Sequence, residues 1–393
     1  MYHNPVRLLT VAFAVFSMFF GAGNLIYPLQ VGLTSGIHGI VGLIGFLLTA
    51  VLLPYLGLFA MILFDGNYNE FFNRLGIIPG QALLCACLMV IGPLIAIPRI
   101  VTLSHVMTAP FIPIPFLQEI TPLSSLIFSF FFLGITFIAT YRPGRVVDVI
   151  GNVITPLLLA SLGLIIVVGL WHTEAPIPTR TDWWTIFSTN LVRGYETLDL
   201  LAGIFFASTV INMLKNNITG DNKMRALTAL CMRAGGIGVS MLALVYTAMH
   251  FLGVFHAYGT EYMNAGELFS YISFKILGTY GAAVIATAVL MACLSTAIAL
   301  CATVARYVQY TLFRNRIAYV YALLLTIVSS IPLTICGLSI VLKWTAGPLV
   351  YIGYPMLITL TICNILYKTM SIKTIKIPMI MTFLITTISY FLK

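Results

Sequence analysis

The first apolar segment of the chain is interrupted by residues Phe20-Gly21-Ala22-Gly23-Asn24-Leu25-Ile26-Tyr27-Pro28. Two glycines one residue apart weaken a helix, and the Asn24 side chain offers the backbone a competing hydrogen-bond partner. Exposed backbone is costly in lipid, so a break at this depth is tolerated only where it is buried in protein or lines a watery cavity. The alternative is a close-packing notch, in which the glycines let a neighbouring helix approach. This segment alone leaves both interpretations open.

The sixth apolar segment carries a second interruption, Arg193-Gly194-Tyr195-Glu196-Thr197-Leu198-Asp199. Glu196 and Asp199 are three residues apart, so they share one face if the segment is helical. Acidic residues at membrane depth are rare and usually functional. The alternative is a stretch at the membrane interface, where Arg193 simply pairs with a carboxylate. The presence of two such interruptions favours a pair of broken helices.

The composition places the chain in a membrane. Of its 393 residues, 60% are hydrophobic and only 8% are charged, with a mean hydropathy of +1.04. A soluble protein needs a charged exterior, which this composition does not supply. Apolar runs of about 18 residues or more recur along the chain, and each is long enough to span the hydrocarbon of a bilayer. The run lengths and the lack of alternating polarity predict an all-α integral membrane protein.

The hydropathy pattern predicts about eleven transmembrane helices, at residues 8–34, 38–63, 80–107, 122–141, 147–171, 187–214, 226–253, 279–307, 317–336, 342–367 and 376–392. The stretch 254–279 has amphipathic spacing, which is typical of a helix on the membrane surface or of a cap.

The positions of the two interruptions predict an internal repeat. Helices 1–5 (residues 1–171) and helices 6–10 (residues 187–367) form two halves, each opening with an interrupted helix, and residues 376–392 add a C-terminal helix. Five is odd, so the halves have opposite orientations, and matched breaks in inverted halves point to a binding site at mid-membrane. Half-helix N-termini can hold a carboxylate there, while freed carbonyls and hydroxyls can hold a cation.

The net charge of +9 resides in short loops, so it indicates membrane orientation and not a nucleic-acid partner. With the N-terminus in the cytoplasm, the cytoplasmic cations are Arg7, Arg74, Arg142, Arg145, Lys215, Lys223, Arg225, Arg233, Arg306, Arg314, Arg316, Lys368, Lys373 and Lys376. The opposite side receives Arg180, Lys275 and Lys393, with Arg99 and Lys343 near helix ends. This bias predicts a cytoplasmic N-terminus.

Several function classes lack their signals in the sequence. No phosphate-binding glycine loop occurs, and the seven cysteines have neither zinc spacing nor a disulfide pattern. A membrane-embedded enzyme needs an Asp-rich Mg²⁺ motif or clustered His and Glu residues, whereas the acidic residues are scattered. A channel needs a filter-like repeat, and none is evident. We therefore expect a carrier that is not an enzyme and has no bound cofactor. It is either driven by an ion or solute gradient or is a passive path.

The eighth segment carries a candidate cation site. Ala292, Ser295 and Thr296 have i, i+3 and i+4 spacing, which places them on one helix face. A hard cation such as Na⁺ prefers oxygen ligands, and one carbonyl with two hydroxyls would supply them. The alternative is that the hydroxyls bond back to their own helix, as is common in membrane helices.

Four motifs in the same order and spacing resemble those of the bacterial branched-chain amino acid:cation symporters, over residues 8 to about 367. They are Phe20-Gly21-Ala22-Gly23-Asn24-Leu25-Ile26-Tyr27-Pro28, Ile91-Gly92-Pro93-Leu94-Ile95-Ala96-Ile97-Pro98-Arg99, Gly194-Tyr195-Glu196-Thr197-Leu198-Asp199 and Ala292-Cys293-Leu294-Ser295-Thr296-Ala297. The resemblance implies a LeuT-like fold of the amino acid–polyamine–organocation superfamily, with a 5+5 inverted repeat whose helices 1 and 6 are broken. It also implies Na⁺-coupled symport of leucine, isoleucine and valine across the bacterial inner membrane.

The resemblance implies roles for particular residues. The substrate carboxylate would meet the first break, at Gly21, Ala22, Gly23 and Asn24. The amino group would lie near Tyr195, Glu196 and Thr197, and the substrate's apolar side chain near Ile95, Leu198 and Phe205. The Na⁺ ligands would be carbonyls near Ser17 and Phe20, together with Ala292, Ser295 and Thr296. Arg99 is either a gate partner of Glu196 or Asp199 or a snorkelling anchor.

The sequence also departs from the family pattern. The family usually has twelve helices, whereas this chain ends after the eleventh, which leaves the oligomeric state open. A Glu is expected shortly after Arg99, where this chain has His105-Val106. Residues 226–253 contain no Asn for a second sodium site, so we expect a single Na⁺. The alternative function is a proton-coupled permease for other neutral amino acids, in which Glu196, Asp199 or His250 carries the proton.

Overall fold

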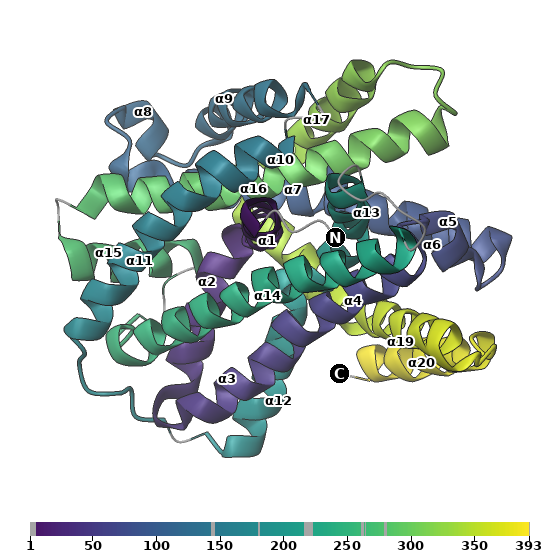
Figure 1. Cartoon of the computed structure of the whole chain (residues 1–393). Coiled ribbons are helices and arrows are strands. Elements are labelled where there is room, and N and C mark those ends of the chain that lie inside the picture. The colour runs from purple at the N-terminus through teal and green to yellow at the C-terminus, as the bar shows by residue number, and fades with distance from the viewer. Residues whose placement is uncertain are drawn as a thin grey trace.

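The computed structural model describes residues 5–142, 146–179, 181–215, 223–260, 263, 265–278 and 281–392. Over these residues the chain is helical throughout and contains no strand (Figure 1). Some cations of the predicted charge bias lie outside the described residues, namely Arg145, Arg180 and Lys393, as do the side chains of Arg7, Lys215, Lys223 and Arg225.

The first half of the chain folds into helices that are often divided by short 3-10 or π-helical turns. They are α1 (Pro5–Phe19), α2 (Ala22–Ser35), η1 (Gly36–His38), α3 (Gly39–Leu47), η2 (Leu48–Leu52), α4 (Leu53–Leu63), α5 (Tyr68–Asn73), α6 (Ile77–Met89), η3 (Val90–Leu94), α7 (Ala96–Thr108), η4 (Ala109–Phe111), α8 (Pro115–Gln118), α9 (Pro122–Thr140), α10 (Val146–Val149), η5 (Ile150–Ile154) and α11 (Thr155–Trp171).

The second half and the C-terminal helix follow the same pattern. Their elements are α12 (Trp183–Arg193), η6 (Gly194–Thr197), α13 (Asp199–Lys215), α14 (Lys223–His256), α15 (Ala265–Leu277), α16 (Ala282–Tyr307), η8 (Val308–Leu312), α17 (Tyr319–Ile335), α18 (Leu338–Trp344), η9 (Thr345–Gly353), α19 (Tyr354–Met370) and α20 (Lys376–Phe391).

Within the described residues, eight helices are long and apolar enough to cross a membrane. Together with the shorter apolar helices Leu8–Phe19, Tyr319–Ile335 and Lys376–Phe391, they can be grouped into eleven crossings that match the predicted ranges, each interrupted helix being counted once. The first crossing is α1 with α2, the second runs from α3 to α4, and the eleventh is α20. Each predicted range overlaps one of these groups, and the all-α membrane fold is confirmed, whereas the count of eleven crossings stays a prediction. The amphipathic stretch forms α15, which packs against α2, α7 and α11 as a cap.

Both predicted interruptions are present. The first helix ends at Phe19 and resumes at Ala22, with Gly21 in an extended conformation (φ −105°, ψ −168°). The sixth crossing changes to a 3-10 turn at Gly194, and Leu198 adopts a left-handed conformation (φ 64°) before α13 begins. Because of this break, Glu196 and Asp199 belong to different helical pieces. The shared face expected for a continuous helix is therefore absent.

Breaks also occur where we predicted continuous helices. Gly92 in the third crossing (φ −96°, ψ −120°) and Gly347 in the tenth (φ −87°, ψ −133°) are both non-helical. Each precedes a proline, whose ring disfavours the helical conformation of the residue before it. The third-crossing break starts α7 anew at Ala96 and brings Arg99 to the centre of the molecule.

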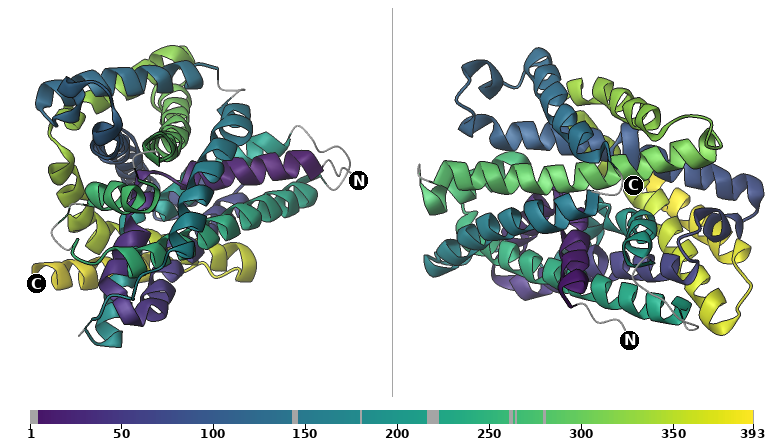
Figure 2. Two further views of the ribbon diagram at one scale, coloured as in Figure 1. Left: turned by 90° about the vertical axis from the view of Figure 1, so that its left-hand side faces the viewer. Right: turned by 45° about the horizontal axis from the view of Figure 1, so that its top comes forward.

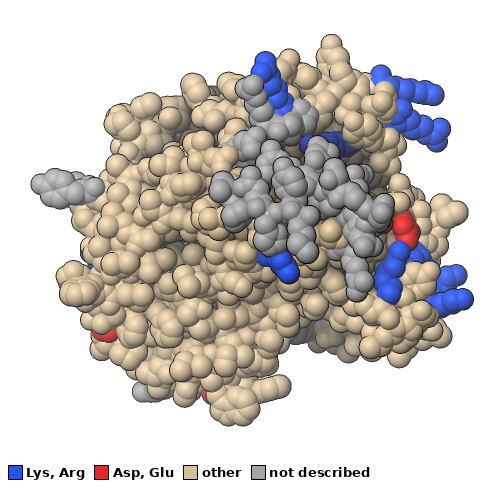
Figure 3. Space-filling model, in the orientation of Figure 1, with Lys and Arg blue, Asp and Glu red and all other residues tan. Residues whose placement is uncertain are grey.

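The connections between crossings lie on two opposite sides of the molecule. In Figure 1 the turns joining α4 to α6, α16 to α17 and α19 to α20 lie on the right, and η1, α8 and α15 lie on the left. Figure 3 shows Lys and Arg atoms gathered mainly toward the right of an otherwise largely uncharged face. The described cations therefore follow the sidedness expected from the loop charges.

The core lies where α16 crosses the molecule. Every residue from 292 to 305 is buried, so this helix is enclosed by protein on all sides. On one flank α1 and α14 run side by side (Figure 2). The α16 face that carries Ser295 and Thr296 thus meets the first helix at its interruption.

Candidate substrate and cation site

A small cavity lies where the two broken helices meet α7 and α16. It is lined by Phe19, Gly21, Ala22, Gly23, Asn24, Ile91, Ala96, Arg99, Ile100, Thr197, Leu198, Asp199, Ala202, Thr296 and Leu300. The structure therefore brings together both breaks, Arg99, Asp199 and Thr296, which the sequence analysis singled out separately. Its volume is about 30 Å³, whereas ligand pockets measure roughly 300–1,000 Å³. An amino acid can enter only if the surrounding helices move apart.

The first break presents a helix N-terminus to this cavity. Gly21 precedes α2, and its N–H donates to the Asn24 side-chain oxygen across 3.3 Å. No acidic residue occupies the first turn of α2. Helix N-termini carry partial positive charge and unpaired N–H groups, so this end is suited to bind a carboxylate.

Arg99, which lies on α7 at the opposite wall of the cavity, binds the backbone of the second break. Its Nη1 donates to the Glu196 carbonyl at 2.7 Å, and its Nη2 donates to the Thr197 carbonyl at 3.1 Å. The residue is only 5% exposed, so the snorkelling interpretation is wrong. Its hydrogen bonds reach backbone carbonyls, so a gate with either carboxylate is not formed in this arrangement. Arg99 instead holds the C-terminal end of the 3-10 turn, where a cation is favourable.

Asp199 joins three of the central helices. Its Oδ2 accepts a hydrogen bond from the Asn24 amide at 2.8 Å and another from the Tyr246 hydroxyl, also at 2.8 Å. The Asn24 amide in turn contacts the Tyr246 hydroxyl. Tyr246, on α14, was not predicted, because one tyrosine in a long apolar helix gives no periodic signal. Asp199 also begins α13, where its charge offsets the helix N-terminus.

Thr296 links α16 to the end of α1. Its hydroxyl lies 3.2 Å from the Met18 carbonyl and 3.5 Å from that of Ser17, and donates to them. The Ser295 hydroxyl donates to the Ala292 carbonyl of its own helix at 3.0 Å, as the alternative interpretation expected. The Ser17 hydroxyl is fully buried and has no partner. An unsatisfied buried hydroxyl is costly, so this oxygen-rich position fits a cation.

The two breaks differ in the groups that bind the backbone carbonyls at the end of the helix before each break. At the second break, the Arg99 guanidinium binds the carbonyls of Glu196 and Thr197. At the first break, the corresponding carbonyls receive only the Thr296 hydroxyl. Phe20, which the resemblance assigns as a ligand, is buried at this break and stacks on Phe16 with ring centroids 5.3 Å apart. A cation is thus built into the second break, whereas the carbonyls of the first break have no charged partner among the described residues.

Other predicted substrate residues lie outside the cavity. Ile95 is a non-helical residue beside it (φ −132°), while Ile91 and Ala96 form the wall. Tyr195 stacks on Tyr354 with ring centroids 5.0 Å apart. Phe205 packs far along α13, against Tyr68 and Phe72. Its apolar character made it a candidate, but six residues beyond Asp199 carry it away from the break.

Arg74 is tied to the tenth crossing by a set of contacts that the sequence did not suggest. Its Nη1 donates to the Cys363 carbonyl at 3.0 Å and to the Asn364 side chain at 2.8 Å. The guanidinium also lies 3.9 Å from the ring centroid of Tyr367. These contacts fix α5 against α19, away from the cavity.

A helical membrane protein with paired helix breaks around a buried cavity is built as a secondary transporter. Among solved structures, the chain is similar to Mhp1, a nucleobase-cation-symport-1 family transporter solved in a closed conformation with bromovinylhydantoin bound. The TM-score is 0.60 at 14% identity, over 96% of this chain and 91% of the other. This likeness establishes the LeuT-like fold.

The family described as "Branched-chain amino acid transport protein" matches residues 5–393, and the chain belongs to that family. Branched-chain amino acid permease BraB of Bacillus subtilis is 30% identical over 93% of this chain and 81% of its own length. The branched-chain amino acid transport system 3 carrier protein of Pseudomonas aeruginosa is 31% identical, with coverages of 91% and 80%. The expectation of a multi-pass carrier and not an enzyme is confirmed by this membership.

Proposed function

We propose that this chain carries leucine, isoleucine and valine into the cell together with Na⁺. The observation that carries the proposal is the asymmetry of the breaks. The first break gives the cavity the N-terminus of α2, and its Ser17 and Met18 carbonyls accept only from the Thr296 hydroxyl, without a charged partner. The family and the names of the relatives supply the substrate class.

The amino acid binds with its carboxylate at the N-terminus of α2, beside the Arg99 guanidinium. The Arg99 Nη2 lies 3.1 Å from where a Cβ on Gly23 would be, so a side chain at that position would block the approach. The ammonium group is directed to the Thr197 carbonyl and Asp199 at the second break. The substrate side chain packs on apolar wall residues, such as Ile91, Ala96, Ile100 and Leu300. Such a wall separates leucine from isoleucine or valine only weakly.

Na⁺ binds between α1 and α16. The proposed ligands are carbonyls near Ser17 and Phe20, the Ala292 carbonyl, and the hydroxyls of Ser295 and Thr296. Both hydroxyls now donate to carbonyls, so they must rotate to point their lone pairs at the ion, and Na⁺ then replaces the lost hydrogen bonds. A single ion is expected.

Coupling follows from the position of the two ligands. Na⁺ ties α1 to α16, and the substrate ties α2 to the second break, so both favour the same occluded arrangement. The first, second, sixth and seventh crossings then rock against the rest to open the path. We assign the protein to the bacterial inner membrane with its N-terminus in the cytoplasm, because the described loop cations lie mainly on one side.

Uptake of labelled leucine into proteoliposomes tests the proposal. Three arms are compared: an inward Na⁺ gradient, an equal K⁺ gradient, and an inward proton gradient without Na⁺. Uptake only with Na⁺ supports symport. Uptake with the proton gradient alone replaces Na⁺ coupling by proton coupling through Glu196, Asp199 or His250. If no gradient drives uptake, the same arms run with alanine and methionine test the remaining neutral substrates.

A further inference from the structure

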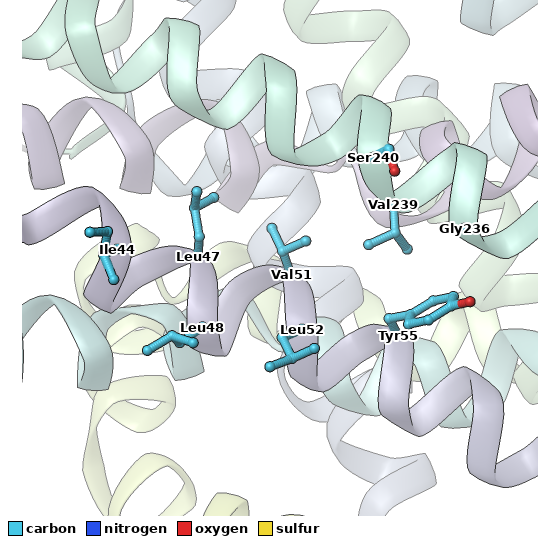
Figure 4. Close-up of a pocket in the computed structure, with 9 residues that line it drawn as sticks. All are labelled: Ile44, Leu47, Leu48, Val51, Leu52, Tyr55, Gly236, Val239 and Ser240. Atoms are coloured by element: carbon cyan, nitrogen blue, oxygen red, sulfur yellow. The ribbon is translucent and has the colours of Figure 1, made fainter. Parts of the chain in front are cut away.

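A long apolar groove opens on the surface between the second and seventh crossings (Figure 4). Its volume is about 570 Å³, and it is separate from the central cavity. One wall runs from α3 through η2 to α4, and the other is α14. The lining residues are Ile44, Leu47, Leu48, Val51, Leu52, Tyr55, Gly236, Val239 and Ser240.

The groove is hollow because of features in both walls. Gly236 has no side chain, and a Cβ there would meet only the Tyr55 hydroxyl, at 3.6 Å. The facing wall contains the π-helical turn η2 (Leu48–Leu52), which widens the helix locally. Such turns occur frequently at functional sites. The two helices therefore stand apart here, although α14 contacts both α3 and α4.

The length of the groove corresponds to one leaflet of a bilayer. From Ile44 to Tyr55 the helical wall rises about 16 Å, at about 1.5 Å per residue. Half of the hydrocarbon core is about 15 Å thick. Three side chains of this wall are partly exposed: Ile44 by 51%, Leu48 by 40% and Leu52 by 47%. The apolar wall therefore faces the groove and the lipid beside it.

One end of the groove is polar and cationic. The Tyr55 hydroxyl donates to the Met232 carbonyl at 3.5 Å, and the exposed Arg233 is the next residue along α14. Arg233, Gly236 and Ser240 are spaced three and four residues apart, so they share one helix face. Side chains lean toward the N-terminus of their helix. This spacing places Arg233 on the groove face of α14, one turn before Gly236 and on the side of Tyr55.

We propose that the groove binds an anionic phospholipid, with one acyl chain along the groove and its phosphate on Arg233. An apolar slot about as long as one leaflet is thick, with an arginine on the same helix face beyond its Tyr55 end, matches an acyl chain attached to a phosphate. Basic positions between transmembrane helices are typical headgroup sites. The bound chain would hold the second crossing against the seventh. Binding itself does not depend on the proposed transport function.

Retention of added lipid by the purified protein tests this proposal, without Na⁺ or substrate. The protein is exchanged into detergent with equal phosphatidylglycerol and phosphatidylcholine, and bound lipids are counted by native mass spectrometry. Gly236→Leu fills the groove and raises helix propensity. Arg233→Gln removes the cation from an exposed position, so the fold is kept. Gly134→Leu on α9 is the control, because a Cβ at Gly134 meets nothing within 4 Å.

The native chain and Gly134→Leu are expected to retain phosphatidylglycerol about fivefold over phosphatidylcholine. Both lipids carry a phosphate, but only the phosphatidylglycerol headgroup keeps a net negative charge, and one basic residue near an anionic headgroup contributes about 1 kcal/mol. Arg233→Gln is expected to hold both lipids equally, and Gly236→Leu to lose both. Equal retention of the two lipids by the native chain would overturn the proposal. An unchanged preference for phosphatidylglycerol in Arg233→Gln would also overturn it. So would the finding that the native chain is a dimer that Gly236→Leu dissociates, because the groove would then hold a second copy of the chain.

Discussion

The side-chain amide of Asn24 donates a hydrogen bond to the Asp199 carboxylate across 2.8 Å, and this contact joins the two broken helices where their second halves begin. Asn24 lies in the first turn of α2, and Asp199 is the first residue of α13. The carboxylate offsets the N-terminus of α13, whereas the N-terminus of α2 keeps its positive end for a ligand. The two breaks thus differ in the charge at the N-terminus of the helix that follows each of them.

Removing the Asp199 charge is expected to disable transport more than folding. Asp199→Asn keeps the size of the side chain, and its carbonyl oxygen can still accept from Asn24 and Tyr246. The two hydrogen bonds are then no longer assisted by a charge. We expect leucine uptake to fall at least tenfold, about 1.4 kcal/mol, which is within the range for a hydrogen bond to a charged group. Uptake rate and thermal stability are measured together. Tyr321→Phe, at a tyrosine that is 67% exposed, is the control.

The Tyr246 hydroxyl is expected to contribute in the same network. Tyr246→Phe leaves the ring packing in place and removes only the donor to Asp199. A buried acceptor that loses one of its donors costs about 1–3 kcal/mol. We expect Tyr246→Phe to lower the melting temperature. Adding Asp199→Asn in a double variant is expected to lower it no further. Fully additive shifts in a double-mutant cycle would show that the two residues act separately.

Arg99 is expected to be irreplaceable by lysine. The guanidinium reaches the carbonyls of Glu196 and Thr197 with two different nitrogens, a geometry that a single ammonium group does not reproduce. Arg99→Lys is therefore expected to raise the KM for leucine and lower the maximal rate, and Arg99→Gln to abolish uptake. Arg316→Gln, at an exposed arginine between η8 and α17, is a charge-matched control. Native uptake in Arg99→Gln would show that the second break needs no cation.

Gly21 is expected to tolerate no side chain. A Cβ there would lie 2.9 Å from the Thr296 hydroxyl oxygen, closer than normal contacts allow. Gly21→Ala would push α16 away from the first break, so we expect a roughly tenfold higher Na⁺ concentration for half-maximal uptake, or about 1.4 kcal/mol. Gly163→Ala on α11 has open space around the new Cβ and should behave as the native chain. An unchanged Na⁺ requirement in Gly21→Ala would argue against a cation at this break.

Gly32 and Gly253 let α2 and α14 cross in backbone contact. A Cβ at Gly32 would lie 2.1 Å from the His250 carbonyl oxygen, and one at Gly253 would lie 2.3 Å from the Leu29 carbonyl oxygen. Small residues permit such close approach in membranes, and overpacking costs about 1–3 kcal/mol. Gly253→Ala is expected to lower the melting temperature clearly, with Gly134→Ala unaffected. Equal melting temperatures would mean that the crossing relaxes freely.

The sequence predicted those features that have local causes. Apolar run lengths indicated the crossings, and the glycines around Asn24 and the charges around Asp199 indicated the breaks. The breaks at Gly92 and Gly347 were missed although each glycine precedes a proline. A glycine followed by a proline is the local signal that could have indicated both breaks.

The contacts of the site were less predictable, because they depend on packing between distant segments. The hydrogen-bond partners of Arg99 are backbone carbonyls. Every residue has one, so the residue types in the sequence do not identify these partners. Tyr246 reaches Asp199 from 47 positions away. Phe205 has the apolar character of a pocket residue, but the helix carries it to the interior near Tyr68.

The Na⁺ dependence of leucine uptake by Thr296 variants tests the proposed cation site most directly. Thr296→Val keeps the shape of the side chain and removes the oxygen, whereas Thr296→Ser keeps the oxygen and removes the methyl group. Uptake into proteoliposomes is measured over a series of Na⁺ concentrations at fixed ionic strength. We predict that Thr296→Ser retains Na⁺-driven uptake and that Thr296→Val loses it. Native Na⁺ dependence in Thr296→Val would contradict the assignment of a cation to the first break.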